Sequence, residues 1–407
     1  MLDATQLGLR LRSARERRSL SQQAVAEALN LQRTAITNIE AGNRAVSTLE
    51  LSRLAGLYGC KPEALLEPAG EADTPIVRLR ALGQLDDDAT QTIDHVIGLC
   101  REGAELRRML EPEFAEGLPN YAVRVRSSGE AVRQGYDIAR EERRRLGLGN
   151  APISNIAGLI SNQAIWVAAS QIPDNMSGFF VNDRSTGLAI IINSRHFPVR
   201  RTFSYAHEYG HALFDREESE RVSKGGNDLV EVRANAFASA FLMPAGGVED
   251  QLRRLDKGRP SRQAQIVYDV AGNAGSEIEI RPTSGSQAIT YQDVAVIARH
   301  FGVSYEAAVW RLKNLGHIGN PETQDLIKQR EAGKQLTKLL KFSDMFEEKE
   351  ASSGEREQEL RGKIAWLAVE AYRREEISQG RLRELAGKLG ISANDLIMLA
   401  EAARAAD

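Results

Sequence analysis

The five residues from His207 to His211 read His-Glu-Tyr-Gly-His, and this motif constrains the chain more than any other feature. Side chains four positions apart on a helix share one face, so the two imidazoles can bind one metal ion, with Glu208 beside them as a base. The alternative is an amphipathic helix with two solvated histidines. The chain has only six histidines, and Gly210 needs a packing or functional reason because a mid-helix glycine costs about 1 kcal/mol. The motif therefore predicts a zinc site.

A catalytic zinc ion takes three protein ligands and keeps one position open. Metzincins take the third from H-E-x-x-H-x-x-G-x-x-H, but Phe214 and Glu217 replace that glycine and last histidine, which excludes the subclass. Glu231 opens the helical segment EVRANAFASAFLMP twenty positions after His211, and we expect it to be the third ligand. Asn235 lies one turn further on the same face and is expected to accept a hydrogen bond from the far ring nitrogen of one histidine.

Zinc lowers the pKa of a coordinated water to about 7, so Glu208 is expected to remove its proton before attack on a carbonyl polarised by the ion. Peptide hydrolysis is the reaction we expect. Carboxylates that compete with Glu231 for the metal lie in a charged stretch that we interpret as solvated surface: Asp215, Glu217, Glu218 and Glu220. Four nearby side chains could stabilise an oxyanion, and the sequence does not choose among them: Tyr205, Tyr209, His196 and Arg201.

A second pattern occupies the N-terminus, where apolar residues recur at helical spacing in short bursts from Leu7 to Leu57. Ser21 as an N-cap and Asn30 as a left-handed turn residue predict a tight helix-turn-helix. The second helix of such a pair enters the major groove of DNA. The expected DNA contacts are Gln32, Arg33, Thr34, Thr37 and Asn38 at the bases, and Gln22 and Arg44 at the phosphate backbone. The alternative is a small helical module that binds protein.

Composition narrows the class of protein. Residues 1–66 hold nine Lys and Arg against six Asp and Glu, whereas the whole chain has a net charge of -3; this modest basic surplus agrees with nucleic-acid binding. Hydrophobic residues at 42% and charged residues at 27% exclude a disordered or fibrous chain. Without a long apolar run or an export signal, and with the isolated Cys60 and Cys100, we expect a cytoplasmic protein with no membrane contact.

The length of 407 residues predicts more than one domain. We expect a helix-turn-helix domain over 1–66, a helical linker over 67–120, an α+β domain over 121–320 and a C-terminal helical module over 321–407. Strands are predicted near Ile165 to Ala169 and in the segment GLAIIIN, and a final helical pair from Ile364 to Ala403. The fold class is thus an α+β multidomain protein with an all-α N-terminal domain.

Two families resemble these segments. Residues 7–66 resemble an XRE (Cro/C1-type) helix-turn-helix through L-R-x-x-R, L-S-Q, V-A-E-A-L, I-x-N-I-E-A-G and L-A-x-L-Y-G. Residues 121–318 resemble the ImmA/IrrE metallopeptidase family through SGFFVND, IIINSR, R-T-F-x-x-A-H-E-x-G-H, E-x-x-A-N-x-F-A-x-x-F-L-M-P and FGVSYEAAVWRLKNLGHI. The resemblance implies a gluzincin-like Zn²⁺ site with His207, His211 and Glu231 as ligands and Glu208 as the catalytic residue.

Members of that family are cytoplasmic peptidases that typically cleave a DNA-binding repressor, whereas here both activities share a chain. The resemblance implies a transcriptional regulator with a zinc-dependent endopeptidase domain, acting on a double-stranded DNA operator and on a protein substrate, either itself or a partner repressor, in a stress, phage or mobile-element response. We expect a homodimer, because such domains read paired half-sites. The alternatives are a silent peptidase fold that serves as a sensor, and an antitoxin-like protein whose C-terminal half holds a partner.

Overall fold

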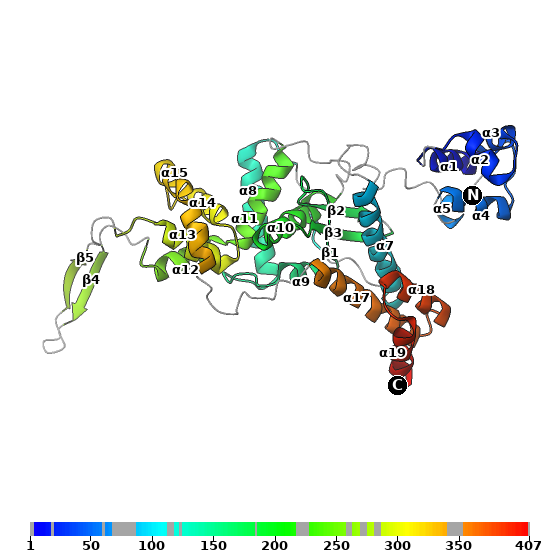
Figure 1. The fold of residues 1–407 in the computed structure, drawn as a ribbon. Helices are drawn as coiled ribbons and strands as arrows, with labels where there is room; N and C mark the ends of the chain where they lie inside the picture. Colours follow the sequence, from blue (N-terminus) through cyan, green and yellow to red (C-terminus); the bar gives the residue numbers. More distant parts are fainter. Residues whose placement is uncertain are drawn as a thin grey trace. The chain divides into compact units, whose positions relative to one another are not determined.

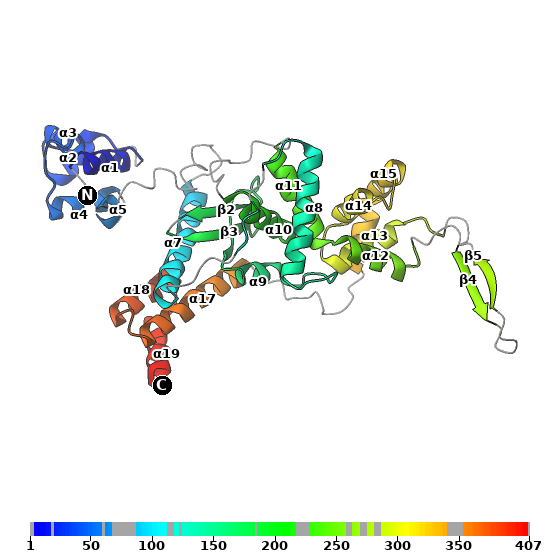
Figure 2. The same cartoon turned by 180° about the vertical axis from the view of Figure 1, so that it is seen from behind.

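The computed structural model describes residues 4–17, 20–58, 62–66, 87–111, 118–121, 124–183, 185–216, 228–257, 263–268, 275–280, 286–339 and 353–405. These residues form two compact units, Met1–Val77 and Arg78–Asp407. Figures 1 and 2 label their helices and strands from opposite sides. Among the described residues, no helix combines the length and hydropathy that crossing a bilayer requires.

The first unit consists of short helices: α1 (Ala4–Arg17), α2 (Gln22–Leu29), α3 (Arg33–Glu40), α4 (Thr48–Tyr58) and α5 (Pro62–Leu66) (Figure 1). The predicted cap and turn are confirmed. The Ser21 side chain accepts a hydrogen bond from the Ala24 amide at the start of α2, and Asn30 ends that helix in the left-handed region with φ 55°. Ile36 and Ile39 of α3 are buried in the core of the unit, which leaves the opposite face of α3 to solvent.

A buried ion pair joins the first helix of this unit to the third. Arg15 Nε lies 2.6 Å from Glu40 Oε1, and Arg15 Nη2 lies 3.0 Å from Glu40 Oε2. Arg15 also donates to the carbonyl oxygen of Leu20 at 2.8 Å, just before α2. These bonds connect α1, α3 and the loop before α2.

The second unit contains a three-stranded sheet in the order β1-β3-β2. The predicted strands are present as β1 (Trp166–Ser170) and β3 (Gly187–Asn193), and they pair in parallel; β2 (Gly178–Asp183) pairs antiparallel to β3. Residues Leu188 to Asn193 of β3 are all buried. Asn193 ends the strand and donates to the carbonyl oxygens of Ile172 and Met176 at 3.0 and 2.9 Å. These hydrogen bonds from Asn193 hold the end of β3 in place before the chain enters the next helix, which begins at Pro198.

Three helices carry the centre of this unit: α8 (Ser128–Arg145), α10 (Pro198–Phe214) and α11 (Leu229–Leu242). α11 lies beside both α8 and α10 (Figures 1 and 2). The rings of Phe237 and Phe241 stack at 5.1 Å, and Tyr209 of α10 lies 5.8 Å from Phe241 between ring centroids. This aromatic core holds α10 and α11 together.

Further helices of the unit are α7 (Asp87–Leu110), α9 (Ile156–Ser161), α12 (Ala245–Arg254), α13 (Tyr291–Phe301), α14 (Tyr305–Asn314), α15 (Asn320–Lys328), α16 (Arg330–Leu339), α17 (Ser353–Arg373), α18 (Gln379–Leu389) and α19 (Ala393–Ala405). Residues 353–405 thus form three helices, α17, α18 and α19, where the sequence predicted a final helical pair. A hairpin of β4 (Gln263–Tyr268) and β5 (Gly275–Ile280) was not predicted, although polar and apolar residues alternate in QAQI and SEIEI, the pattern typical of a strand.

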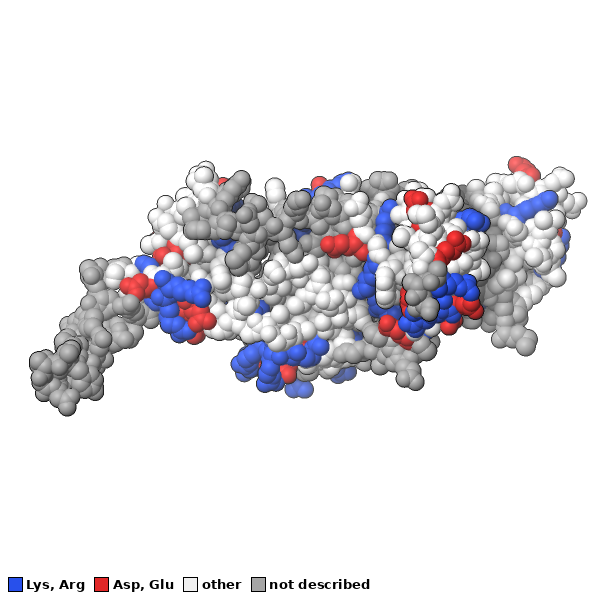
Figure 3. All heavy atoms as spheres, turned by 90° about the horizontal axis from the view of Figure 1, so that it is seen from below, with Lys and Arg blue, Asp and Glu red and all other residues white. Residues whose placement is uncertain are grey.

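α7, the helix expected within a linker, packs against the sheet and the C-terminal helices. The Arg107 guanidinium lies 4.1 Å from the centre of the Trp166 ring of β1. Glu102 accepts from Arg381 of α18 at 2.6 Å and also pairs with Lys388. Figure 3 shows that basic and acidic side chains also lie in mixed clusters on the face that it draws. The C-terminal helices therefore pack against α7, the first described helix of the second unit.

Candidate metal centre

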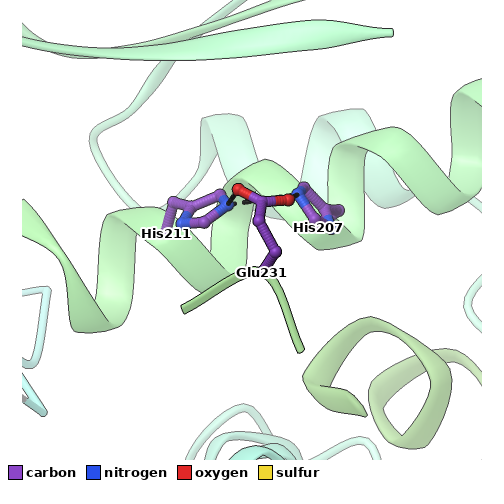
Figure 4. A group of neighbouring side chains, drawn as sticks. All are labelled: His207, His211 and Glu231. Carbon is purple, nitrogen blue, oxygen red and sulfur yellow. Dashed lines mark hydrogen bonds and ion pairs between the residues drawn. The ribbon is translucent and has the colours of Figure 1, made fainter. Parts of the chain in front are cut away.

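His207 and His211 of α10 and Glu231 of α11 point their polar atoms at one another (Figure 4). His207 Nε2 lies 3.3 Å from Glu231 Oε2, and His211 Nε2 lies 3.4 Å from Glu231 Oε1. The two Nε2 atoms are 3.1 Å apart. Ligand atoms around a tetrahedral zinc ion, at about 2.0 to 2.1 Å from the metal, are separated by about 3.3 to 3.4 Å. The spacing and chemistry of this donor set fit zinc.

The far nitrogen of each imidazole contacts an acceptor. His207 Nδ1 lies 3.0 Å from Asn235 Oδ1, and His211 Nδ1 lies 2.8 Å from Asp215 Oδ2. Because both partners accept, each Nδ1 can carry a hydrogen, and each Nε2 then either binds a proton shared with Glu231 or, once that proton leaves, offers its lone pair to a metal ion. Two lone pairs and a carboxylate then face one small space, and they repel one another unless a cation binds there. The Asn235 contact is the one expected from the sequence.

Asp215 was expected on the solvated surface, and this expectation was wrong. Its side chain is buried. Asp215 follows the last residue of α10 and lies one turn from His211, so the two side chains can meet. Arg233 of α11 donates to Asp215 Oδ1 at 2.5 Å and to Gln134 Oε1 of α8 at 3.1 Å. Three helices therefore hold the carboxylate that orients His211. The other acidic candidates, Glu217, Glu218 and Glu220, lie outside the described residues.

The charges around the site favour a bound cation. Burial lowers the pKa of His211, but its hydrogen bonds with Asp215 and Glu231 and the charge of Glu208 raise that pKa to about 10. Burial raises the pKa of Glu231, and the hydrogen bonds from both histidines outweigh it and hold the pKa well below its usual range. The carboxylates thus create a negative potential that a proton or a metal ion can neutralise.

Glu208 lies on α10 between the two histidines and is buried, with 7% of its surface exposed. Burial raises its pKa above the ordinary value, and the charge of Glu231 adds to this, whereas His207 and His211 lower the pKa. A carboxylate with a raised pKa beside a donor set for zinc is suited to accept and return a proton.

Two glycines allow α11 to approach closely enough for Glu231 to reach the histidines. A Cβ atom at Gly210 would lie 3.1 Å from the Phe237 ring. At Gly135 of α8, a Cβ atom would lie 2.6 Å from the carbonyl oxygen of Arg233 and 2.8 Å from the amide nitrogen of Phe237. Gly210 therefore has a packing reason for its place inside the motif.

Two of the four oxyanion candidates are occupied with packing. The Tyr209 hydroxyl donates to Glu142 of α8 and its ring lies in the aromatic core. Tyr205 belongs to the same core, with 1% of its surface exposed. His196 Nε2 lies 3.4 Å from the carbonyl oxygen of Asp174. Arg201 is buried, with 9% of its surface exposed.

On the first unit, the outer face of α3 is polar. The side chains expected to contact bases are all exposed there: Gln32, Arg33, Thr34, Thr37 and Asn38. Gln22 is partly buried, and its side chain is oriented by α3, because it donates to Glu40 Oε2 at 2.8 Å and accepts from Thr37 Oγ1 at 3.1 Å. Arg44 pairs with Glu50 at 2.6 Å. The side chains expected at the phosphate backbone are thus oriented by their own neighbours.

Comparison with known families agrees with both halves of this description. Residues 6–69 match the model of a helix-turn-helix domain, and residues 160–261 match the model of the IrrE N-terminal-like domain, a peptidase family. The second match includes the sheet, α10 and α11, and so all three converging side chains. A search of curated proteins found no match. The chain therefore combines a helix-turn-helix domain with an IrrE N-terminal-like peptidase domain, as the sequence resemblance indicated.

Proposed function

We propose that this chain, which joins a helix-turn-helix domain to an IrrE N-terminal-like peptidase domain, is a DNA-binding transcriptional regulator with zinc-dependent endopeptidase activity. The observation that carries the proposal is the convergence of His207, His211 and Glu231, with polar atoms 3.1 to 3.4 Å apart, beside the buried Glu208. Its substrate is a regulatory protein, either this chain or a partner repressor.

Zinc bound by these three side chains supplies a Lewis acid that polarises the scissile carbonyl and acidifies a water molecule. Asn235 and Asp215 keep both imidazole rings in the orientation that directs Nε2 into the site. Glu208 takes the proton from the attacking water and gives it to the leaving amine. Its burial supports both steps, because the raised pKa lets the carboxylate hold that proton between them.

On the DNA side, we propose that the exposed polar face of α3 enters the major groove, with Gln22 and Arg44 at the phosphate backbone. The core beneath that face, built on Ile36 and Ile39, keeps the helix rigid. Two copies of the chain would read paired half-sites in the cytoplasm, with residues 1–66 as the DNA-binding domain and residues 121–320 as the peptidase domain.

The test combines metal analysis with cleavage of a protein. The purified chain should contain about one zinc ion per molecule, and His207→Ala should lose it. Incubation of the zinc-loaded chain, alone and with candidate DNA-binding repressors, should give defined fragments by mass spectrometry. Glu208→Gln keeps shape and metal and should give none. Equal cleavage by Glu208→Gln would contradict the catalytic role, and bound zinc without cleavage by the native chain would favour the sensor alternative.

A further inference from the structure

An apolar track leads away from the metal-binding residues along the N-terminal half of α10. It consists of Phe203, one turn before His207, and Val199, one turn earlier still. The Phe203 ring lies 6.4 Å from the His207 ring between centroids, with 33° between the ring planes. Phe203 is partly buried and Val199 is 39% exposed. At a spacing of four residues, all three side chains lie on one face of the helix.

The spacing of the track matches an extended polypeptide. Four residues of helix span about 6 Å along its axis. In an extended chain, side chains two residues apart lie on the same side and are separated by about 6.6 to 6.8 Å. A peptide held at the metal and running along α10 would therefore place one side chain on Phe203. The side chain two residues further along the peptide would lie on Val199.

The positive charge of Arg200 beside the track discriminates among the side chains of a bound peptide. Arg200 is exposed on α10, and it lies on the same face as His207 because the two residues are seven positions apart. Its guanidinium donates to Ser177 Oγ at 3.1 Å. A basic side chain on the track would be repelled by this fixed charge, whereas an apolar side chain gains from covering the exposed carbon surface of Phe203 and Val199.

We propose that the apolar track is a substrate subsite that binds an apolar side chain next to the scissile peptide bond, and a second one two residues further on. This inference rests on the proposed peptidase function, because it takes the metal as the point from which the substrate extends. It names the class of sequence that the site accepts: apolar residues around the cleaved bond, without a basic side chain on the track.

Hydroxamates that bind zinc test the subsite without a known substrate. Binding of three probes to the zinc-loaded full chain is measured by calorimetry: acetohydroxamate, a hydroxamate with an isobutyl side chain, and one with an aminobutyl side chain. The isobutyl probe should bind about tenfold more tightly than acetohydroxamate, equivalent to about 1.4 kcal/mol. The aminobutyl probe should show no such gain.

Phe203→Ala should reduce the isobutyl gain, taken as the ratio of isobutyl to acetohydroxamate affinity in the same variant, to about twofold or less, and Phe203→Leu should retain most of this ratio. Phe197→Ala is the matched control. Phe197 is 81% exposed and precedes α10, about 15 Å from His207 along the helix axis, so its removal should change neither affinity.

The outcomes separate the subsite from the peptidase proposal. Equal affinity for acetohydroxamate and the isobutyl probe, or an isobutyl gain that survives Phe203→Ala, would overturn the apolar track while the metal site stands. If none of the three probes binds, the zinc site of the proposed function is contradicted, and the track with it.

Discussion

Asp215 and Arg233 form a buried ion pair, with Arg233 Nη2 2.5 Å from Asp215 Oδ1, and the other oxygen of the same carboxylate lies 2.8 Å from His211 Nδ1. Arg233 lies two residues after Glu231 on α11. Helix α11 therefore provides Glu231 as a proposed metal ligand. It also provides Arg233, which holds the Asp215 carboxylate that orients His211. Loss of the pair should therefore weaken metal binding and also destabilise the unit, because it leaves a buried charge without its partner.

Asp215→Asn should weaken zinc binding by about 10- to 100-fold, because His211 loses the charged partner that orients its ring and strengthens it as a ligand. Competition with a chromophoric chelator gives the affinity. Asp137→Asn is the control, since Asp137 lies on the surface of α8 and pairs with Arg140. Unchanged zinc affinity in Asp215→Asn would contradict the positioning role of the carboxylate.

Gly135→Ala should lower the free energy of unfolding by about 1 to 3 kcal/mol, because overpacking forces α8 and α11 apart. The new Cβ would meet backbone atoms of Arg233 and Phe237, which cannot rotate away. Zinc affinity should fall as well, since Glu231 moves with α11. Gly129→Ala on the same helix meets no atom within 4 Å and should leave both unchanged. Urea unfolding and chelator competition measure the two effects, and native-like values for Gly135→Ala would show that the helices can separate without cost.

Glu40→Gln should destabilise the first unit by about 3 to 5 kcal/mol, because it leaves the Arg15 guanidinium buried without its charged partner. DNA affinity should also fall, since Glu40 holds Gln22 in place. Hydrogen exchange of amides in α1 and α3 of the full chain reports the local stability. The double variant Arg15→Met with Glu40→Leu should recover much of it. Native protection in Glu40→Gln would mean that the pair contributes little.

Arg33→Ala should weaken binding to duplex DNA selected by the native chain from a random pool, by about 1 to 3 kcal/mol if Arg33 contacts a base. A phosphate contact would instead weaken binding to all sequences and reduce the salt slope by about one unit. Arg53→Ala removes the same charge from α4, away from the outer face of α3, and serves as the control. Equal effects of both substitutions in a fluorescence titration would argue against a recognition role for α3.

Local patterns were sufficient to predict several features correctly. Ser21 and Asn30 cap the two ends of α2, the first helix of the helix-turn-helix, and the strands near Ile165 and in GLAIIIN are present. These features depend on neighbours a few positions away, whose geometry is set by the backbone itself. The hairpin of β4 and β5 was missed although SEIEI alternates polar and apolar residues, and the three-helix C-terminal end was missed because charged segments carry weak periodicity.

The sequence by itself determined that His207 and His211 share one helix face with Glu208 beside them, since a spacing of four residues is nearly one helical turn. Only the tertiary structure decided how close Glu231 comes, because that distance depends on the approach of α11 past Gly135 and Gly210. The same holds for Asp215, which looked like solvated surface until Arg233 and His211 were seen around it. Burial and partners arise from packing between segments distant in the chain, and no local pattern specifies them.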